Sequence, residues 1–152
     1  MIRVLFVCAG NICRSPTAEG VLRARAAVAG LNCEVASAGM GGWHVGEAPD
    51  ERSIAVASSK GYDLSAQSAQ QIEPEDFHRY DHIIAMDQGH LRQLKNIPHQ
   101  GGPAQVSLMM DWAGGESGID VPDPYYGEGD GFMAVLEMIE TAVDGFLAQA
   151  NA

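Results

Sequence analysis

The chain of 152 residues has few cysteines, few basic side chains and no long hydrophobic run. Its three cysteines, an odd number, argue against a framework of paired disulfides and agree with a reducing compartment. No stretch reaches the ~18 consecutive apolar residues that a membrane span needs. The first residues also lack the charged, apolar and small-residue segments of a secretory signal. We therefore expect a cytoplasmic protein with no membrane partner.

Positive charge is scarce. Nine Lys and Arg residues face 20 Asp and Glu residues, which gives a formal net charge of -11. A surface of this sign repels polyanions, so we expect no nucleic-acid partner. It also opposes a phosphorylated substrate, although local positive groups act at contact distance while the bulk field is screened within ~8–10 Å. The length and the 46% hydrophobic content fit one domain over residues 1–152.

Metal-binding spacings are missing as well. The sequence has neither an H-E-x-x-H nor a C-x-x-C motif, and the separation of Cys8 and Cys13 suits no usual zinc site. We therefore expect no metal and no cofactor, so any chemistry must come from the side chains themselves.

A specific pattern opens the chain. The apolar run Val4-Leu5-Phe6-Val7 is typical of a strand buried on both faces, and it ends abruptly at Cys8. Ser15 followed by Pro16 is a helix start signal, with Ser15 as the predicted N-cap of a helix from Pro16 to about Ala29. The intervening loop thus joins the carboxyl end of a strand to the amino end of a helix. Free backbone N–H groups and the helix dipole favour an anion there.

A thiol and a guanidinium stand at the two ends of that loop. Five residues separate Cys8 from Arg14, enough to wrap backbone amides around a tetrahedral oxyanion. Arg14 can offer a bidentate fork to two oxygens, and these positive groups favour the thiolate form of Cys8. Ser15 could donate a hydrogen bond to the sulfur. A buried Cys8 with a surface Arg14 is the alternative, but packing alone gives little reason for such a polar run at the end of a core strand.

The segment Val7 to Pro16 resembles the C-x5-R-S/T-P signature of the low-molecular-weight protein tyrosine phosphatases. The resemblance implies that Cys8 is the nucleophile and Arg14 the phosphate binder. It also implies phosphate-binding roles for the rest of the loop: Ala9, Gly10, Asn11, Ile12, Cys13 and Ser15.

Later segments extend the resemblance. Asp123 lies between two prolines in the run Asp123-Pro124-Tyr125-Tyr126-Gly127, which matches the general-acid segment of the family. On its own, Asp-Pro would be an ordinary turn. The resemblance implies that Asp123 is the general acid and base, and that Tyr125 and Tyr126 flank the substrate.

Three further positions are implied by the same resemblance. Ser37 is expected to support the phosphate loop, and Trp43 to form one wall of the substrate cleft, although an isolated Trp is often a core residue. Asp87 is expected to support the acid-bearing loop, and a simple helix N-cap is the alternative. The chain departs from the family at Gln67 and Gln70, where His and Arg are usual. The His helps to hold the asparagine of the loop, which puts the rigidity of this loop in question.

Strands and helices alternate along the chain. Strands are predicted near residues 2–7, 33–38, 80–86 and 103–108, with helices at 16–29, 49–60, from 87, and in an amphipathic segment after 131. Val21, Leu22 and Val28 are predicted to face inward on the first helix, and Gly30 to end it. Such alternation predicts an α/β fold with parallel strands. With the resemblance, we expect three layers around a central four-stranded parallel sheet flanked by helices, the phosphotyrosine phosphatase I type.

The implied activity is hydrolysis of phosphotyrosine in proteins through a phosphocysteine intermediate. The partners would be a tyrosine-phosphorylated protein as substrate and inorganic phosphate as product, with the enzyme a monomer or weak dimer. Alternatives of the same fold are a protein arginine phosphatase, which typically has threonine in place of Ile12, and a thiol-dependent arsenate reductase, for which only Cys33 is left as a further cysteine. A catalytically dead phosphate-binding module is a third.

The role of the second loop cysteine is left open. Cys13 is either a redox partner of Cys8 or a buried filler.

Overall fold

The structure is a computed structural model that describes residues 1–99, 101–126 and 130–150, with only the backbone of residues 126 and 130. The elements follow one another in this order: β1 (Ile2–Cys8), α1 (Arg14–Ala29), β2 (Cys33–Gly39), α2 (Glu51–Ser59), α3 (Asp76–Arg79), β3 (His82–Ala85), α4 (Gln88–Lys95), β4 (Gln105–Leu108), the 3-10 helices η1 (Met109–Ala113) and η2 (Pro124–Tyr126), and α5 (Asp130–Ala150).

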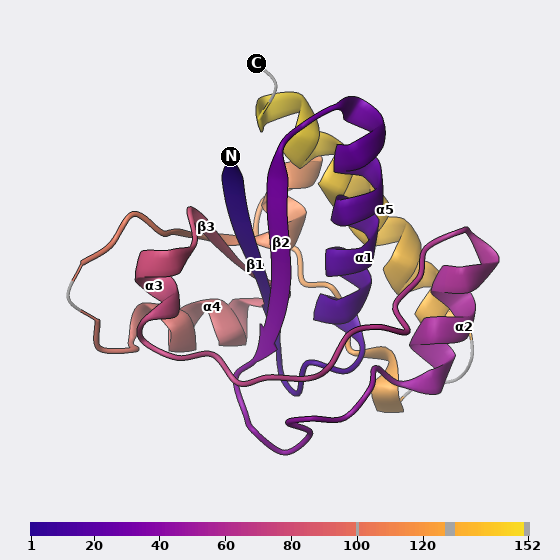
Figure 1. Cartoon of the computed structure of the whole chain (residues 1–152), viewed down its shortest axis with the longest axis horizontal. Coiled ribbons are helices and arrows are strands. Elements are labelled where there is room, and N and C mark those ends of the chain that lie inside the picture. Colours follow the sequence, from indigo (N-terminus) through magenta and orange to yellow (C-terminus); the bar gives the residue numbers. More distant parts are fainter. Residues whose placement is uncertain (100, 127–129, 151–152) are drawn as a thin grey trace.

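The four strands form one parallel sheet in the order β2-β1-β3-β4. The predicted central four-stranded parallel sheet flanked by helices is therefore confirmed. The register places Cys8 opposite Gly39, and Val7 opposite Ala85. The carboxyl ends of the inner strands thus meet at one edge of the sheet, the lower edge in Figure 1.

Helices cover both faces of this sheet (Figure 1). Val4 and Phe6 pack in a core with α1 and α5, whereas Leu5 and Val7 pack in a second core with α3 and α4. All four side chains are at most 1% exposed, so the strand buried on both faces is confirmed. The predicted apolar stripe of α5 is buried as well: Phe132, Val135, Leu136, Ile139, Val143, Phe146 and Leu147.

The start of α1 differs from the prediction. The helix begins at Arg14 rather than Pro16, and its N-cap is Cys13, which makes no side-chain capping bond. Ser15 cannot act as the N-cap because it lies inside the first turn, where its hydroxyl is 3.0 Å from the sulfur of Cys8. The end was predicted correctly, since Gly30 adopts the left-handed conformation with φ of 71°.

One inward position on α1 was also wrong. Val21 and Leu22 are fully buried, but Val28 is 91% exposed. Residues 27–30 are all exposed, so the last turn of the helix extends beyond the elements that cover the rest of it.

The remaining helices agree with the sequence signals. Asp50 is the N-cap of α2 and its carboxylate accepts a hydrogen bond from the backbone of Arg52. Strands β3 and β4 are shorter than predicted, with four residues each. Among the helices of the described chain, none combines the length and hydropathy needed to cross a membrane.

Candidate active site

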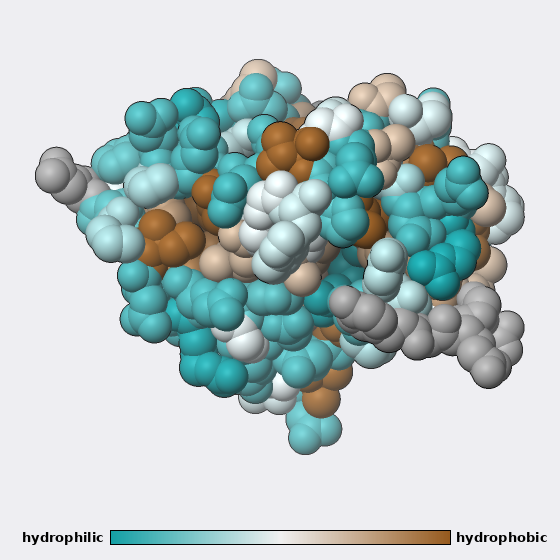
Figure 2. All heavy atoms as spheres, turned by 90° about the horizontal axis from the view of Figure 1, so that it is seen from below, coloured by the Kyte–Doolittle hydropathy of each residue, from teal (hydrophilic) through white to brown (hydrophobic). Residues whose placement is uncertain are grey.

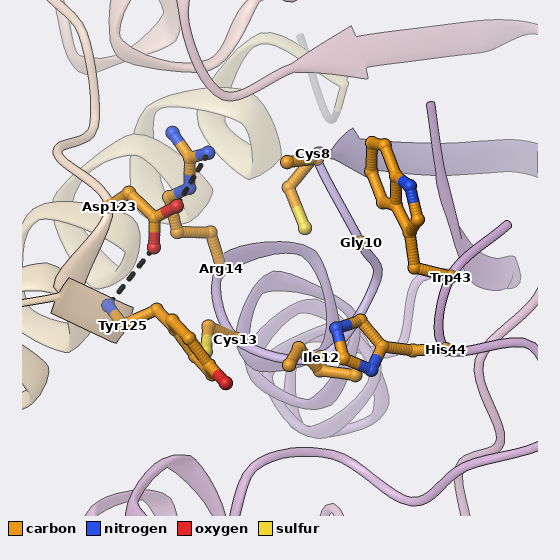
Figure 3. Close-up of a pocket in the computed structure, with 10 residues that line it drawn as sticks. Cys8, Gly10, Ile12, Cys13, Arg14, Trp43, His44, Asp123 and Tyr125 are labelled. Atoms are coloured by element: carbon orange, nitrogen blue, oxygen red, sulfur yellow. Dashed lines mark hydrogen bonds and ion pairs between the residues drawn. The ribbon is translucent and has the colours of Figure 1, made fainter. Parts of the chain in front are cut away.

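Cys8 ends β1 at the carboxyl edge of the sheet, and the loop from Ala9 to Cys13 carries the chain into α1. The side chain of Cys8 is 2% exposed, and its sulfur points into a pocket (Figure 3). The hydroxyl of Ser15 lies 3.0 Å from that sulfur. Strand β1, the loop and the first turn of α1 therefore place a thiol and a hydroxyl together.

Asn11 fixes the shape of this loop. It is the single non-glycine residue with positive φ among those described, at 60°, a conformation that costs most L-residues energy but that Asn tolerates. Its side-chain nitrogen donates to the hydroxyls of Ser15 at 2.9 Å and Ser37 at 2.8 Å. Its side-chain oxygen accepts a bond of 2.9 Å from the backbone N–H of Gln70. The structure thus holds Asn11 from three sides.

Behind Asn11 lies a carboxylate that sequence analysis missed. The hydroxyl of Ser37 donates to Glu19 at 2.7 Å, and Glu19 pairs with Arg23 at 2.7 Å. Glu19 is only 8% exposed. Glu and Arg four residues apart are common on helices whatever their surroundings, so nothing in the sequence links this pair to the loop.

The departure from the family at Gln67 and Gln70 leaves Asn11 fully bonded. The Gln67 side chain donates instead to the carbonyl of Pro16 at 3.0 Å, and that of Gln70 donates to the carbonyl of Ser37 at 2.9 Å. The oxygen of Asn11 relies on a backbone N–H, which no substitution of Gln70 other than proline removes.

Arg14 is oriented by two acceptors. Its Nη1 donates to the carboxylate of Asp87 and to the carbonyl of Val121, both at 2.9 Å. Asp87 also caps α4, because its carboxylate accepts a hydrogen bond of 2.8 Å from the backbone N–H of His90. The same side chain therefore fills both expected roles: it holds Arg14 and it is the N-cap of α4. Burial acts to raise the pKa of Asp87, but the His90 N–H and the Arg14 guanidinium outweigh it and lower the pKa.

Asp123 reaches the same place from a distant part of the chain. Its Oδ2 lies 3.7 Å from Nη2 of Arg14, and its Oδ1 accepts from the backbone N–H of Tyr125 at 3.0 Å. The side chain is 34% exposed. The segment before it is fixed because the N–H of Val121 donates to the carbonyl of Met86 at 2.9 Å.

These groups surround one cavity of about 100 Å³ (Figure 3). Figure 3 shows Asp123, Arg14 and Tyr125 on one side of it and Trp43 and His44 on the other. The lining residues are Cys8, Ala9, Gly10, Ile12, Cys13, Arg14, Trp43, His44, Asp123 and Tyr125. Among the sequence-predicted residues, Asn11, Ser15, Ser37 and Asp87 stand behind this lining, and the side chain of Tyr126 lies outside the described part.

His44 is the lining residue that sequence analysis did not assign. A Cβ on Gly10 would lie 2.9 Å from its ring, so only glycine leaves room for the imidazole against the loop. Its Nδ1 lies 3.0 Å from the carboxylate of Glu47. Its position next to Trp43 in a glycine-rich loop was the available signal.

Cys13 sits in a different environment from Cys8. It is 5% exposed, and burial raises the pKa of its thiol to about 12, although a hydrogen bond with Ser53 acts in the opposite direction. Cys13 nevertheless lines the same cavity as Cys8, so the redox partner and the buried filler both stay predictions.

The surface around the pocket is polar, and the described residues form no cluster suited to a metal ion. Hydrophilic residues cover most of the face at the carboxyl ends of the strands, and hydrophobic ones lie in separate spots (Figure 2). No group of three or more His, Cys, Asp and Glu side chains in the described ranges could hold a metal ion. The site is an anion pocket with a thiol at its base.

Comparison with known proteins gives a consistent result. Residues 3–152 match the family model of the Low molecular weight phosphotyrosine protein phosphatase. A Low molecular weight protein-tyrosine-phosphatase of Streptomyces coelicolor is 50% identical, over 96% of this chain and 92% of the relative. The crystal structure of Primo-1 matches with a TM-score of 0.94 and 31% identity over 100% of both chains. That of YfkJ from Bacillus subtilis matches with a TM-score of 0.86 and 36% identity over 99% of this chain and 95% of that one. The chain therefore belongs to the low-molecular-weight protein tyrosine phosphatase family.

Proposed function

We propose that this family member hydrolyses phosphotyrosine in proteins with Cys8 as nucleophile, Arg14 as phosphate binder and Asp123 as general acid and base. The observation that carries the assignment is the convergence of the three side chains on one cavity, although Asp123 lies far from the other two in the sequence. Family membership supports phosphorylated proteins as substrates.

The first step forms a phosphocysteine. The Cys8 thiolate attacks phosphorus, a sulfur–phosphorus bond forms, and the bond between phosphorus and the phenolic oxygen breaks. Asp123 in its carboxylic acid form gives its proton to that oxygen, so tyrosine leaves as the neutral phenol.

Charge on the transferring group is stabilised by fixed donors. The loop amides and the Arg14 guanidinium hold the equatorial oxygens, and no donor has to reorganise during the step. Arg14 is already fixed by Asp87 and by the carbonyl of Val121, which limits the entropy lost when the phosphate binds.

The second step releases phosphate. Water attacks phosphorus while the Asp123 carboxylate takes a proton from it, the sulfur–phosphorus bond breaks, and the pair of electrons returns to Cys8 as thiolate. Ser15 lies within hydrogen-bond distance of the sulfur and can donate to the developing negative charge. Inorganic phosphate is the second product.

The cycle demands opposite ionisation of two groups at its start, with the sulfur charged and the Asp123 carboxyl neutral. Activity should therefore follow a bell-shaped profile with its maximum on the acid side of neutrality.

The walls of the pocket favour a flat aromatic substrate. Ile12, Trp43 and Tyr125 line it, and Trp43 is 73% exposed at the mouth, where a phenyl ring could pack against it. Tyr126 is assigned to the same wall from the family pattern alone.

The proposed partners follow from charge and composition. We assign a tyrosine-phosphorylated protein as substrate, no nucleic-acid or membrane partner, a cytoplasmic location, and a monomer or weak dimer. The net charge of -11 disfavours polyanions, while the pocket provides local positive groups for a single phosphate.

The alternatives of the same fold are not favoured. An arsenate reductase relay would need a further cysteine near the site besides Cys8 and Cys13, but Cys33 begins β2 opposite Ile2, at the far end of the strand that Cys8 ends. Ile12, rather than the threonine typical of arginine phosphatases, lines the pocket.

The test is a single substitution. Cys8→Ser should reduce hydrolysis of p-nitrophenyl phosphate to background, because the serine hydroxyl is not ionised at neutral pH, while circular dichroism and the melting temperature stay close to those of the wild type. EDTA should leave wild-type activity unchanged. Near-normal turnover by the serine variant would refute the assignment, and loss with EDTA would refute metal independence.

A further inference from the structure

We propose that Arg52 is a positioning residue for the general acid, acting through the peptide of Tyr125. The inference rests on the proposed role of Asp123. It adds a residue of α2 to a machinery that otherwise comes from the phosphate loop and the acid-bearing segment.

The link between Arg52 and Asp123 runs through a single residue. Nη2 of Arg52 donates to the carbonyl of Tyr125 at 3.2 Å, and the backbone N–H of Tyr125 donates to Oδ1 of Asp123 at 3.0 Å. Arg52 thus holds the residue whose N–H orients the Asp123 carboxyl. In this arrangement the other oxygen of Asp123 remains on the side of Arg14.

Ring contacts support the same segment. The guanidinium carbon of Arg52 lies 5.5 Å from the ring centre of Tyr125 and 4.6 Å from that of Phe132 at the start of α5. Both distances allow cation–π attraction. Arg52 therefore contacts one residue of η2 and one residue near the start of α5.

Arg52 is itself fixed to the phosphate loop. Its Nε and Nη2 donate to the two carboxylate oxygens of Asp50, both at 3.1 Å. The backbone N–H of Asp50 donates to the carbonyl of Ile12 at 2.7 Å. A continuous chain of contacts thus joins Ile12, which lines the cavity, to the peptide that orients Asp123.

This arrangement has a direct kinetic consequence. Without the guanidinium, Tyr125 loses a carbonyl partner and a stacking partner, so the carboxyl of Asp123 should spend less time facing the leaving oxygen. Only the two proton transfers of Asp123 should suffer, donation to the leaving oxygen in the first step and acceptance from water in the second, and kcat/KM reports the first of them. Phosphate binding by Arg14 and attack by Cys8 should persist.

The experiment compares two aryl phosphates with the Arg52→Gln variant. For phenyl phosphate, a poor leaving group that needs the proton, kcat/KM should fall about tenfold, which is part of the ~10²–10⁴-fold that general acid catalysis supplies. For 2,4-dinitrophenyl phosphate, a good leaving group, the loss should be at most about twofold. Arg52→Lys, which keeps the charge but loses the fork, should lie between Arg52→Gln and the wild type.

Two backgrounds separate positioning from general damage. In an Asp123→Ala background, Arg52→Gln should cause no further loss with phenyl phosphate, because the group that it positions is gone. Arg79→Gln is the matched control, since Arg79 also pairs with carboxylates on its own short helix but lies on α3. It should leave both rates unchanged.

The possible failures point to different assumptions. Equal losses of Arg52→Gln with both esters, or a further loss in the Asp123→Ala background, would overturn the positioning role. If Asp123→Ala alone slowed both esters equally, the general-acid assignment would fail instead, whatever Arg52 does.

Discussion

Ser15 serves three neighbours with one hydroxyl. Its oxygen accepts from the side chain of Asn11 at 2.9 Å, lies 3.0 Å from the sulfur of Cys8, and lies 3.5 Å from the backbone carbonyl of Ala38. Asn11 donates to this oxygen, so the single hydroxyl hydrogen is shared between the Ala38 carbonyl and the sulfur, and a negative charge on the sulfur draws it toward Cys8. A neutral serine thereby becomes a donor directed at a negative charge, in a site where water is largely excluded.

The two loop cysteines should differ strongly in reactivity. Burial raises the pKa of Cys13 to about 12, so at pH 7 its thiolate is on the order of one part in 10⁵, and that fraction rises about tenfold with each pH unit. Brief treatment of the native protein with iodoacetamide near neutrality should alkylate Cys8 and leave Cys13 unmodified. Mass spectrometry of peptides after digestion measures both sites.

Phosphate provides the control for this prediction. Added inorganic phosphate should protect Cys8, because both occupy the same cavity, and should leave Cys13 unaffected. Unfolding in urea before treatment should expose all three cysteines to the reagent. Equal labelling of Cys8 and Cys13 in the native protein would contradict the raised pKa of the Cys13 thiol on which the prediction depends.

Some side chains of the site could be assigned from the sequence and others could not. Cys8 and Arg14 were accessible because a strand signal, a helix signal and a fixed spacing all fall within one short segment. Glu19 and His44 were not, because their partners in the site, Ser37 and Gly10, are brought to them only by the packing of β2 and its loop. Residues that support a site from a distance leave little local pattern.

At the scale of elements, boundaries depended on contacts that local signals do not contain. Ser15 followed by Pro16 predicted the start of α1 two residues too late, because the Ser15 hydroxyl is used by the active site instead of capping the helix. The inward position of Val28 failed because the last turn of α1 has no covering element. In contrast, β1 and α5 were predicted well, since the apolar run of β1 and the apolar stripe of α5 both coincide with the residues that are buried.

Close packing of α5 makes a second prediction. A Cβ on Gly145 would lie 1.8 Å from the backbone carbonyl oxygen of Trp112 in η1, which is an impossible distance. Gly145→Ala should therefore lower the free energy of unfolding by ~1–3 kcal/mol. This figure is the net loss, after the ~1 kcal/mol that alanine gains over glycine in a helix. Urea unfolding followed by circular dichroism measures the change.

Gly115→Ala is the matched control, because a Cβ at Gly115 would meet no atom within 4 Å. The free energy of unfolding of that variant should stay within ~0.5 kcal/mol of the wild type. Stabilisation by Gly145→Ala would mean that α5 can move away from η1 at no cost, and would contradict the packing described here.

The acid-bearing segment shows how elements far apart in sequence build one site. Val121 donates to Met86 at the end of β3, and its carbonyl accepts from Arg14 at the start of α1. Asp123 follows two residues later. The sequence alone made Asp123 an ordinary turn residue, and it became a candidate only through the family pattern. The contact of Arg52 with Tyr125 left no sequence signal at all.

For the whole molecule, the charge distribution sets the conditions of encounter. Most basic side chains already lie within 4.0 Å of a carboxylate: Arg3, Arg14, Arg23, Arg25, Arg52, Lys60 and Arg79. The acidic excess is therefore left largely uncompensated at the surface. A dianionic phosphate approaches against this field until it reaches the loop amides and Arg14.

This opposition predicts opposite salt dependences for two substrates. We expect kcat/KM for a phosphotyrosine peptide flanked by Glu to rise severalfold between low and physiological ionic strength, because salt screens its repulsion from a protein of net charge -11. The same peptide with Lys in place of Glu should show a fall, because salt screens its attraction. The value of kcat should change little for either, since contacts inside the pocket are shielded from salt.

Because both peptides carry the same phosphotyrosine, competition by chloride in the pocket would lower both values of kcat/KM alike. Parallel changes for the two peptides would therefore contradict the role of the surface field, and opposite slopes would support it.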